Sequence, residues 1–589
     1  MMETIVIAVV GVIVVALATA LGPRIGIAGP LALVAIGLGV SLLPFVPPQQ
    51  IDPEIILVVV LPPLLYSAAV SLPAIEFRRD FRPVAGLSIL LVLLSAAALA
   101  FFFLLVIPGI DLYLAIALGA ILSPTDAVAT SIVKKLGIST RVVTMLEGES
   151  LLNDATSLVL LRTAVAAIAV GSLSVGGAIL AFLWGVLIAV VVGALVGLLA
   201  LRARAWIGHS AANTALSFVV PFVAYLPTEQ LGGSGLVAAV VAGIVTGQGA
   251  ARWFTPEQRL SDELNWRTVE LMLEGAVFLV MGLELKEIVE QNLAADQGIG
   301  RGVWLAIAAV SIVLVVRSGY VAVLVLSQGR RARRVSRERL ESISDRFEQA
   351  AANGPPDRRT LRGRSGRTAP KPRRPAPPET AERRVQRVRG RMTRALADLD
   401  YYQAAPLGWK HGTVIVWAGM RGVVTLAAAQ TLPRDTPERA LLVFVAFLVA
   451  VGSLMLQGFT LPWLVRLLGL EGSGASGPTV QEQQRLDDEL RTAAASGLTS
   501  GSLTRRNGSA FSRDLLDAVG SRLTQPPDDD TSARAQDVLE LRLALIGVMR
   551  VRLNALSRDG TFSTAALRHA LAELDADQLS LELRLDDEL

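Results

Sequence analysis

The chain of 589 residues contains no cysteine and only three histidines. The absence of cysteine excludes disulfides and cysteine-ligated metal sites, and so few histidines make a histidine pH sensor a weak hypothesis. Charged residues are also scarce, at 18%, whereas hydrophobic residues make up 52% of the chain. This balance lies outside the range of soluble globular proteins and indicates an integral membrane protein. The basic residues lie in loops, so we expect no nucleic-acid partner.

The apolar residues form repeated blocks near the ~20 residues that a helix needs to cross a bilayer. Polar breaks separate thirteen such blocks, which predicts an all-α polytopic membrane protein. No basic residue precedes the first block, so we expect an uncleaved span rather than a secretory signal. The predicted spans are residues 4–21, 27–45, 54–72, 84–106, 112–133, 145–169, 175–200, 211–226, 234–248, 265–285, 302–327, 411–432 and 440–467.

Basic residues concentrate in alternate loops between these spans. By the positive-inside rule those loops are cytoplasmic. An odd number of spans then places the N-terminus outside and the C-terminus in the cytoplasm of a multi-pass protein of the cell membrane. The basic residues of these loops are Arg24, Arg78, Arg79, Arg82, Lys134, Lys135, Arg141, Arg202, Arg204, Arg252 and Arg259, followed by the arginine-rich stretch after residue 328.

Two segments are too polar for lipid, so the membrane domain comprises residues 1–327 and 409–470. The insertion 328–408 is rich in arginine and proline and cannot bury enough apolar area to fold alone. Two interpretations stay open for it, a partly disordered solvated linker or a basic surface held against anionic lipid headgroups. The tail 471–589 begins with glycine and serine and ends in helical periodicity, which predicts a helical cytoplasmic tail.

A cluster of polar groups interrupts the sixth span. A charged side chain at the middle of a bilayer-spanning helix costs roughly 2.5 to 3.5 kcal/mol, so such a group indicates a functional site. Ser150 and Asp154 are four residues apart, and their oxygens can meet a single ion from one helix face. Apolar residues fill the opposite half of the helix. The polar half, which we expect to bury against protein or water, consists of Glu149, Ser150, Asn153, Asp154 and Ser157.

A proline and an aspartate stand together in the fifth span, in the stretch Ser123-Pro-Thr-Asp126. Pro124 lacks an amide hydrogen and displaces the carbonyl of the preceding turn, so backbone oxygens near Leu122 and Thr125 can face a cavity. Hard cations prefer oxygen ligands, and Asp126 supplies negative charge. These two stretches are therefore candidates for a cation site, with Asp154, Ser150 and Asp126 as side-chain ligands and the backbone near Thr125 beside them.

The twelfth span contains Arg421 between glycines, in the stretch Gly419-Met-Arg-Gly422. This span follows the fifth by seven, an offset that fits inverted repeats whose broken helices cross at the bilayer midplane. A buried arginine needs an anion nearby, and we expect a structural ion pair between Glu149 and Arg421. The alternative is that Arg421 reaches to the membrane interface.

Further ionisable residues lie in the tenth and eleventh predicted spans. Glu274 and Glu284 belong to the tenth span, where either could border an access funnel. For Glu284 we expect a solvated, inert position at the extracellular end. For Arg317, in the eleventh span, we expect a role in packing.

These residues also carry a resemblance to a known family. The stretch Gly148-Glu-Ser-Leu-Leu-Asn-Asp-Ala155 is similar to the most diagnostic motif of the monovalent cation/proton antiporters, which include the bacterial NhaP-type and animal sodium/proton exchangers. Its Asn-Asp pair is typical of their electroneutral branch. The resemblance covers spans 1 to 13, with further matches at Ser123-Pro-Thr-Asp126, Gly419-Met-Arg-Gly422, Phe278-Leu-Val-Met-Gly-Leu-Glu284 and Gln457-Gly-Phe-Thr-Leu-Pro462.

The resemblance implies an NhaA-like antiporter fold and a homodimer, in which a core domain moves as an elevator against a dimerisation domain. It also implies roles for the site residues. The transported ion would be carried by Asp154, coordinated by Ser150, Asp126 and the backbone of Thr125, oriented by Asn153 and braced by Glu149 with Arg421. One departure is Ser67, which stands where many relatives have glutamate. It predicts a less anionic site and leaves the choice between Na+, K+ and Li+ open.

The resulting hypothesis is exchange of Na+ (or Li+ or K+) for H+ across the bilayer, with no enzymatic activity and no cofactor. Burial favours a protonated aspartate and a bound cation favours the ionised form, so the two occupants compete for Asp154. Alternating access then couples their gradients. Two other classes stay open. A cation channel would show a filter-like ring motif, and an aspartyl intramembrane protease would need Asp126 and Asp154 to share a proton.

Overall fold

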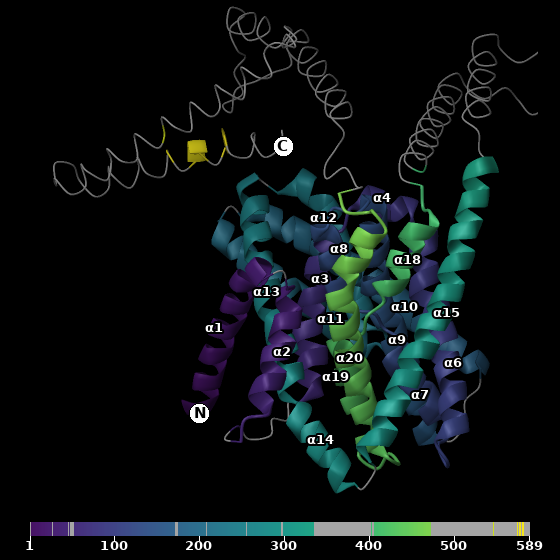
Figure 1. The fold of residues 1–589 in the computed structure, drawn as a ribbon. Coiled ribbons are helices and arrows are strands. Elements are labelled where there is room, and N and C mark those ends of the chain that lie inside the picture. Colours follow the sequence, from purple (N-terminus) through teal and green to yellow (C-terminus); the bar gives the residue numbers. More distant parts are fainter. Residues whose placement is uncertain are drawn as a thin grey trace, which may run out of the picture. The chain divides into compact units, whose positions relative to one another are not determined.

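In a computed structural model, the part of the chain that the structure describes consists of helices and the segments that connect them, without strands (Figure 1). Contacts divide the chain into two units, residues 1–476 and 477–589. Most of the predicted insertion 328–408 and of the predicted tail 471–589 lies outside the described residues. Those residues are 2–25, 27–44, 46, 52–170, 175–207, 209–254, 256–295, 298–334, 402 and 406–472, with 546, 574, 576–578, 580 and 581 in the second unit.

The first unit is a bundle of helices that follow the predicted apolar blocks. Several long helices are continuous across a predicted span, whereas the spans that contain Pro124 and Gly422 are divided. The helices are α1 (Met2–Ile25), α2 (Gly29–Ser41), the π-helical η1 (Ile55–Val60) with α3 (Leu61–Ser71), α4 (Ala74–Arg79), α5 (Phe81–Ala85), η2 (Gly86–Leu90), α6 (Leu91–Val106), α7 (Leu112–Leu122), α8 (Val128–Lys135), α9 (Thr140–Val170), α10 (Val175–Trp206), α11 (Ser210–Gln230), α12 (Gly235–Trp253), α13 (Pro256–Leu283), α14 (Leu285–Ala294), α15 (Ile299–Arg334), α18 (Trp409–Trp417), α19 (Val423–Gln430) and α20 (Arg439–Leu467).

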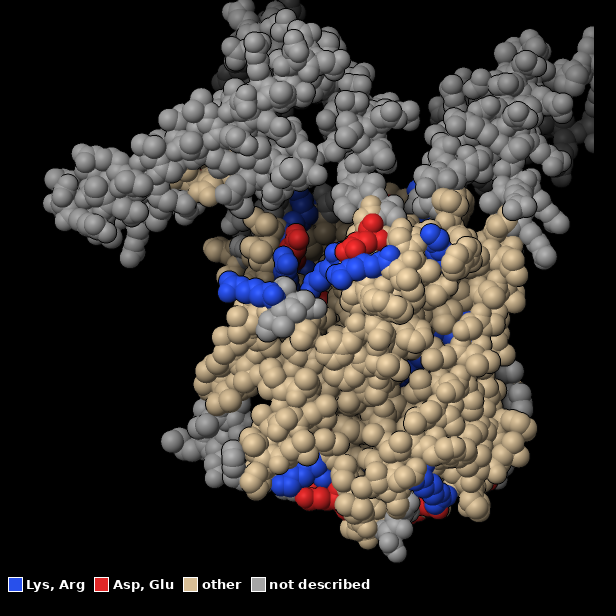
Figure 2. All heavy atoms as spheres, in the orientation of Figure 1, with Lys and Arg blue, Asp and Glu red and all other residues tan. Residues whose placement is uncertain are grey.

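The surface of this bundle is that of a membrane protein. Within the described ranges, six helices are long and apolar enough to cross a membrane, and five more are apolar but shorter. Figure 2 shows most of the visible charged side chains at two opposite ends, with a broad uncharged band between them. Large apolar side chains are also exposed, among them Leu183, Trp184 and Leu187 of α10. The predicted total of thirteen spans stays a prediction.

Two helices are interrupted, and their interruptions touch. The first break, residues 123–127, separates α7 from α8, and the second, residues 418–422, separates α18 from α19. The amide of Asp126 donates a hydrogen bond of 2.8 Å to the carbonyl of Met420, which joins the two breaks directly. Pro124 and the flanking glycines explain why the backbone leaves the helical path here.

Apolar side chains pack the bundle into two buried clusters. The larger one includes α6, α7, α9, α18, α19 and α20, and the smaller one joins α3, α10, α11, α12 and α13 around Tyr66 and Trp266. Small residues allow close helix contacts, as at Gly37 of α2, where an added methyl group would meet Gly282 of α13. The region between α3 and α13 on one side and α9 with the two breaks on the other stays open and forms a cavity.

Candidate ion-binding site

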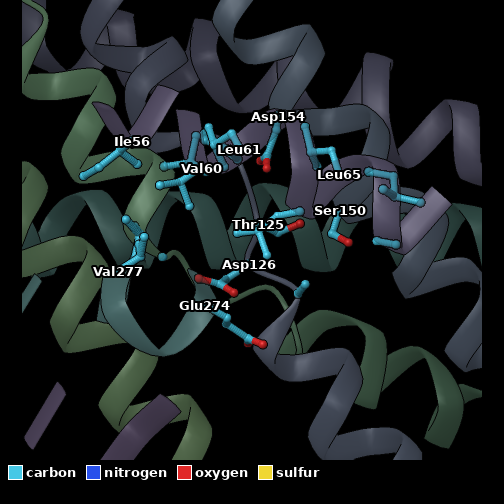
Figure 3. Close-up of a pocket in the computed structure, with 18 of the residues that line it drawn as sticks. Ile56, Val60, Leu61, Leu65, Thr125, Asp126, Ser150, Asp154, Glu274 and Val277 are labelled. Carbon is cyan, nitrogen blue, oxygen red and sulfur yellow. The ribbon is translucent and has the colours of Figure 1, made fainter. Parts of the chain in front are cut away.

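A cavity of about 180 Å3 lies beside the two breaks, and we call it the inner cavity. Its walls come from η1, α3, α9, α13, α19 and the first break. Figure 3 shows Asp154, Asp126 and Glu274 with Thr125 and Ser150 around this space. The structure therefore brings together four of the predicted ion-binding residues, Asp154, Asp126, Ser150 and Thr125. The polar residues that line the inner cavity are Thr125, Asp126, Ser131, Ser150, Asp154, Glu270, Glu274 and Thr425.

Asp154 lies in the middle of α9, with 8% of its surface exposed. Within the described part of the chain, no group donates a hydrogen bond to its carboxylate. Ser150, one turn earlier on α9, lines the same cavity, as the four-residue spacing predicted. A buried carboxylate without hydrogen-bond donors is costly in its ionised form. A proton or a cation in the cavity would remove that cost.

Asp126 lies where two helices begin. Its Oδ1 accepts a hydrogen bond of 2.9 Å from the amide of Val128, the first residue of α8. Its Oδ2 lies so close to Gly422, the residue before α19, that a Cβ at position 422 would overlap the carboxylate. The amino-terminal ends of two short helices therefore face this carboxylate, and their partial positive charge favours its ionised form.

The predicted ion pair between Glu149 and Arg421 is wrong. Glu149 instead pairs with Arg317 of α15, whose Nη2 lies 2.9 Å from Oε2 and whose Nη1 contacts Oε1. Both side chains are almost fully buried, so Arg317, for which we expected a role in packing, is also the ion-pair partner of Glu149. The reason is geometric. Arg317 reaches Glu149 from a neighbouring helix, while Arg421 has other acceptors within reach.

Arg421 binds backbone carbonyls at the end of α7. Its Nε donates to the carbonyl of Leu122 at 3.1 Å, and its Nη2 donates to Ser123 at 3.5 Å. Arg317 does the same at the end of α18, donating from Nε and Nη2 to the carbonyl of Ile415 at 3.0 and 2.9 Å. Each arginine therefore satisfies a helix carboxyl end that the breaks leave open. The carbonyl of Leu122, which we expected to face a cavity, is occupied by Arg421.

Thr125 and Asn153 connect the ion pair to the first break. The hydroxyl of Thr125 donates to Oε1 of Glu149 at 3.4 Å and accepts a hydrogen bond from the side-chain amide of Asn153. Glu149 and Asn153 do not line the inner cavity but a small separate polar pocket, together with Arg317 and Arg421. The polar half of α9 thus divides between the inner cavity and this bracing network.

Two carboxylates of α13 border the inner cavity, Glu270 and Glu274. A position for Glu274 at a funnel was one expectation, whereas Glu270 was not expected at the site. The available signal was its four-residue spacing from Glu274 within the predicted span 265–285. Glu284 is not solvated, because only 2% of it is exposed and the side-chain amide of Gln430 donates a hydrogen bond of 3.0 Å to its Oε2. Within the described ranges, no three His, Asp or Glu side chains form a metal centre.

A helical bundle with an apolar belt, two touching broken helices and a cavity of buried carboxylates defines a membrane transporter for small ions. The chain matches the family described as sodium/hydrogen exchanger, transmembrane, over residues 10–337 and 392–467. It therefore belongs to the sodium/hydrogen exchanger family.

Individual relatives agree with this assignment. The chain is 39% identical over 277 residues to the uncharacterized Na+/H+ exchanger YjcE of Escherichia coli, a match that covers 46% of this chain and 50% of that protein. It is 27% identical over 594 residues to the uncharacterized Na+/H+ exchanger Rv2287 of Mycobacterium tuberculosis, covering 98% and 96%. The solved sodium proton antiporter MjNhaP1 of Methanocaldococcus jannaschii shares the fold, with a TM-score of 0.55 at 14% identity, over 80% of this chain and 99% of that one.

Proposed function

We propose that this protein exchanges Na+ for H+ across the membrane, with Asp154 as the residue that binds either ion. The observation that carries the proposal is the buried Asp154 carboxylate, which lacks a hydrogen-bond donor in the described structure and faces a cavity with Asp126 and Ser150. Membership of the sodium/hydrogen exchanger family supports the same substrates. K+ and Li+ remain alternative cations because Ser67 removes one expected acidic group.

The chemistry follows from competition for one carboxylate. An empty, ionised Asp154 is disfavoured by its burial, and either a proton or a cation relieves the penalty. Asp126, Ser150 and the backbone carbonyl of Thr125 would supply further oxygen ligands, which Na+ needs when it sheds its water. The helix amino-terminal ends at Asp126 favour negative charge there, so in this proposal Asp126 adds an oxygen ligand while Asp154 changes its occupant.

The transport cycle in this proposal is alternating access within a homodimer. An occupied Asp154 moves with its domain between the two sides of the membrane, whereas an empty and charged site does not cross. With the thirteen spans predicted from the apolar blocks, the positive-inside rule places the N-terminus outside and the C-terminus in the cytoplasm. Exposed apolar side chains of α10, such as Leu183 and Leu187, need lipid or a second copy to cover them.

The deciding experiment is ion flux in liposomes that contain the purified full-length protein. An imposed Na+ gradient should drive H+ in the opposite direction, and Asp154→Asn should abolish this exchange. Asp435→Asn is the matched control, because Asp435 is exposed and remote from the inner cavity. Thermal stability of each variant in detergent checks that it folds. Intact exchange in Asp154→Asn would overturn the role of this residue.

The same liposomes test stoichiometry and the two rival classes. We expect no dependence on membrane potential, because one Na+ exchanged for one H+ moves no net charge. A current that valinomycin with K+ alters would contradict the electroneutral mechanism. Na+ flux without counter-movement of H+ would instead indicate a channel, and peptide cleavage without flux would indicate a protease.

A further inference from the structure

A second, larger cavity adjoins the inner cavity. This outer cavity measures about 690 Å3 and carries four basic side chains on its walls, Lys134, Arg204, Arg259 and Arg267. The first three belong to loops or helix ends that the positive-inside rule places in the cytoplasm. The two cavities share lining residues, and the polar ones among them are Ser131, Ser150 and Glu270.

The face of α13 that lines both cavities carries acids at helical spacing. Glu263 lines only the outer cavity, Glu270 lines both, and Glu274 lines only the inner one. These positions follow the seven- and four-residue steps of one helix face, so they form a row along α13. From Glu263 to Glu274 the row rises about 16 Å along the helix axis. Glu270 therefore occupies the junction of the two cavities.

Glu270 lacks the direct salt bridge that two other carboxylates of the outer cavity form. In the outer cavity, Glu147 pairs with Lys134 at 3.7 Å and Asp262 pairs with Arg204. Glu270 forms no salt bridge in the described part of the chain. Its Oε2 accepts only a hydrogen bond of 3.4 Å from the hydroxyl of Ser67 on α3. A carboxylate that protein cations leave unpaired at the junction of two cavities favours a mobile cation beside it.

We propose that Glu270, with the hydroxyl groups of Ser67 and Ser150, forms a relay site for the monovalent cation between the outer cavity and Asp154. The inference rests on the proposed exchange of Na+ for H+ and adds a second binding position to it. Ser67 provides no charge of its own, and Glu270 supplies a carboxylate from the opposite helix at the same contact. The cation exchanges part of its water for these oxygens before it reaches Asp154.

The test measures initial Na+ uptake by proteoliposomes as a function of Na+ concentration. Glu270→Gln should raise the KM for Na+ about tenfold, because it removes one charge from a poorly screened position. The maximal rate should change much less, since Asp154 is intact. Glu290→Gln on α14 is the control, because Glu290 is exposed and lines neither cavity. An unchanged KM in a stable Glu270→Gln protein would overturn the relay site.

Moving the carboxylate from position 270 to position 67 tests whether Glu270 acts through its charge or has a structural role. In the double variant Ser67→Glu with Glu270→Gln, the carboxylate moves across the 3.4 Å contact but stays at the junction. The KM should return toward the wild-type value. If the KM stays raised while the thermal stability is normal, the position of Glu270 matters for another reason and the relay is wrong. Failure of the proposed function is distinguishable, because the wild-type protein would then show no Na+-driven H+ movement.

Discussion

Arg317 and Glu149 form a buried pair that ties three helices together. Nη2 of Arg317 lies 2.9 Å from Oε2 of Glu149, and the side chains are only 2% and 1% exposed. The same guanidinium donates to the carbonyl of Ile415 at the end of α18. Glu149 is one residue before Ser150 on α9, so the pair holds the ion-binding helix in register with the second break.

Removing either partner of this pair should destabilise the protein. Arg317→Gln or Glu149→Gln leaves one charge buried without its counter-ion, which typically costs about 3 to 5 kcal/mol. The double variant should cost clearly less than the sum, because no lone charge remains. Reversible unfolding of the purified protein in detergent measures all three values.

An exposed ion pair is the control for these measurements of stability. Arg466 and Glu471 lie 3.4 Å apart with side chains 64% and 50% exposed, so Arg466→Gln should cost less than about 1 kcal/mol. Additive effects of Arg317→Gln and Glu149→Gln would show that the two buried groups do not stabilise each other.

Gly422→Ala should strongly reduce transport although it adds only a methyl group. That methyl group would overlap the carboxylate of Asp126, so Asp126 or the second break must move. Gly452→Ala in α20 is the matched substitution, because nothing lies within 4 Å of its added methyl group. We expect Gly452→Ala to transport normally and Gly422→Ala to fold but exchange little Na+. Normal exchange by Gly422→Ala would mean that the contact between the breaks is not needed.

Asp126→Asn tests whether the charge of Asp126 contributes to Na+ binding separately from its hydrogen bond at the first break. Asparagine keeps an oxygen that accepts from the amide of Val128, so thermal stability should change little. The lost negative charge should raise the KM for Na+. Asp126→Ala also loses the hydrogen bond and should be less stable by about 1 kcal/mol. Equal Na+ affinity in wild type and Asp126→Asn would exclude Asp126 from the site.

Acidification should weaken Na+ binding without lowering the rate at saturating Na+. Protonation of Asp154 removes the form that binds the cation, so the KM for Na+ rises as the pH falls. Where the protonated form dominates, each pH unit should multiply the KM by about ten. Initial uptake rates measured over a Na+ series at several pH values give both parameters. A falling maximal rate with a constant KM would contradict competition for one carboxylate.

Local sequence patterns predicted most of the helices and about half of the contacts in the candidate site. Apolar blocks of membrane-spanning length predicted the helices, and the four-residue spacing placed Ser150 and Asp154 on one face. Pro124 and Gly422 predicted the two breaks, because backbone geometry at proline and glycine is a local property. A resemblance at the Asn-Asp motif led to the sodium/hydrogen exchanger family, to which the chain belongs.

Contacts between distant helices needed the tertiary structure. Either of two buried arginines, Arg317 or Arg421, could have formed the ion pair with Glu149. Only the packing of α15 against α9 and α18 brings Arg317 into contact with it. Arg421 donates hydrogen bonds to backbone carbonyls at the end of α7, and no pattern of side chains in the sequence predicts such contacts. The pairing of Ser67 with Glu270 joins residues 203 positions apart. Sequence alone determined which residues are costly in a membrane, whereas the three-dimensional packing decided which partners offset that cost.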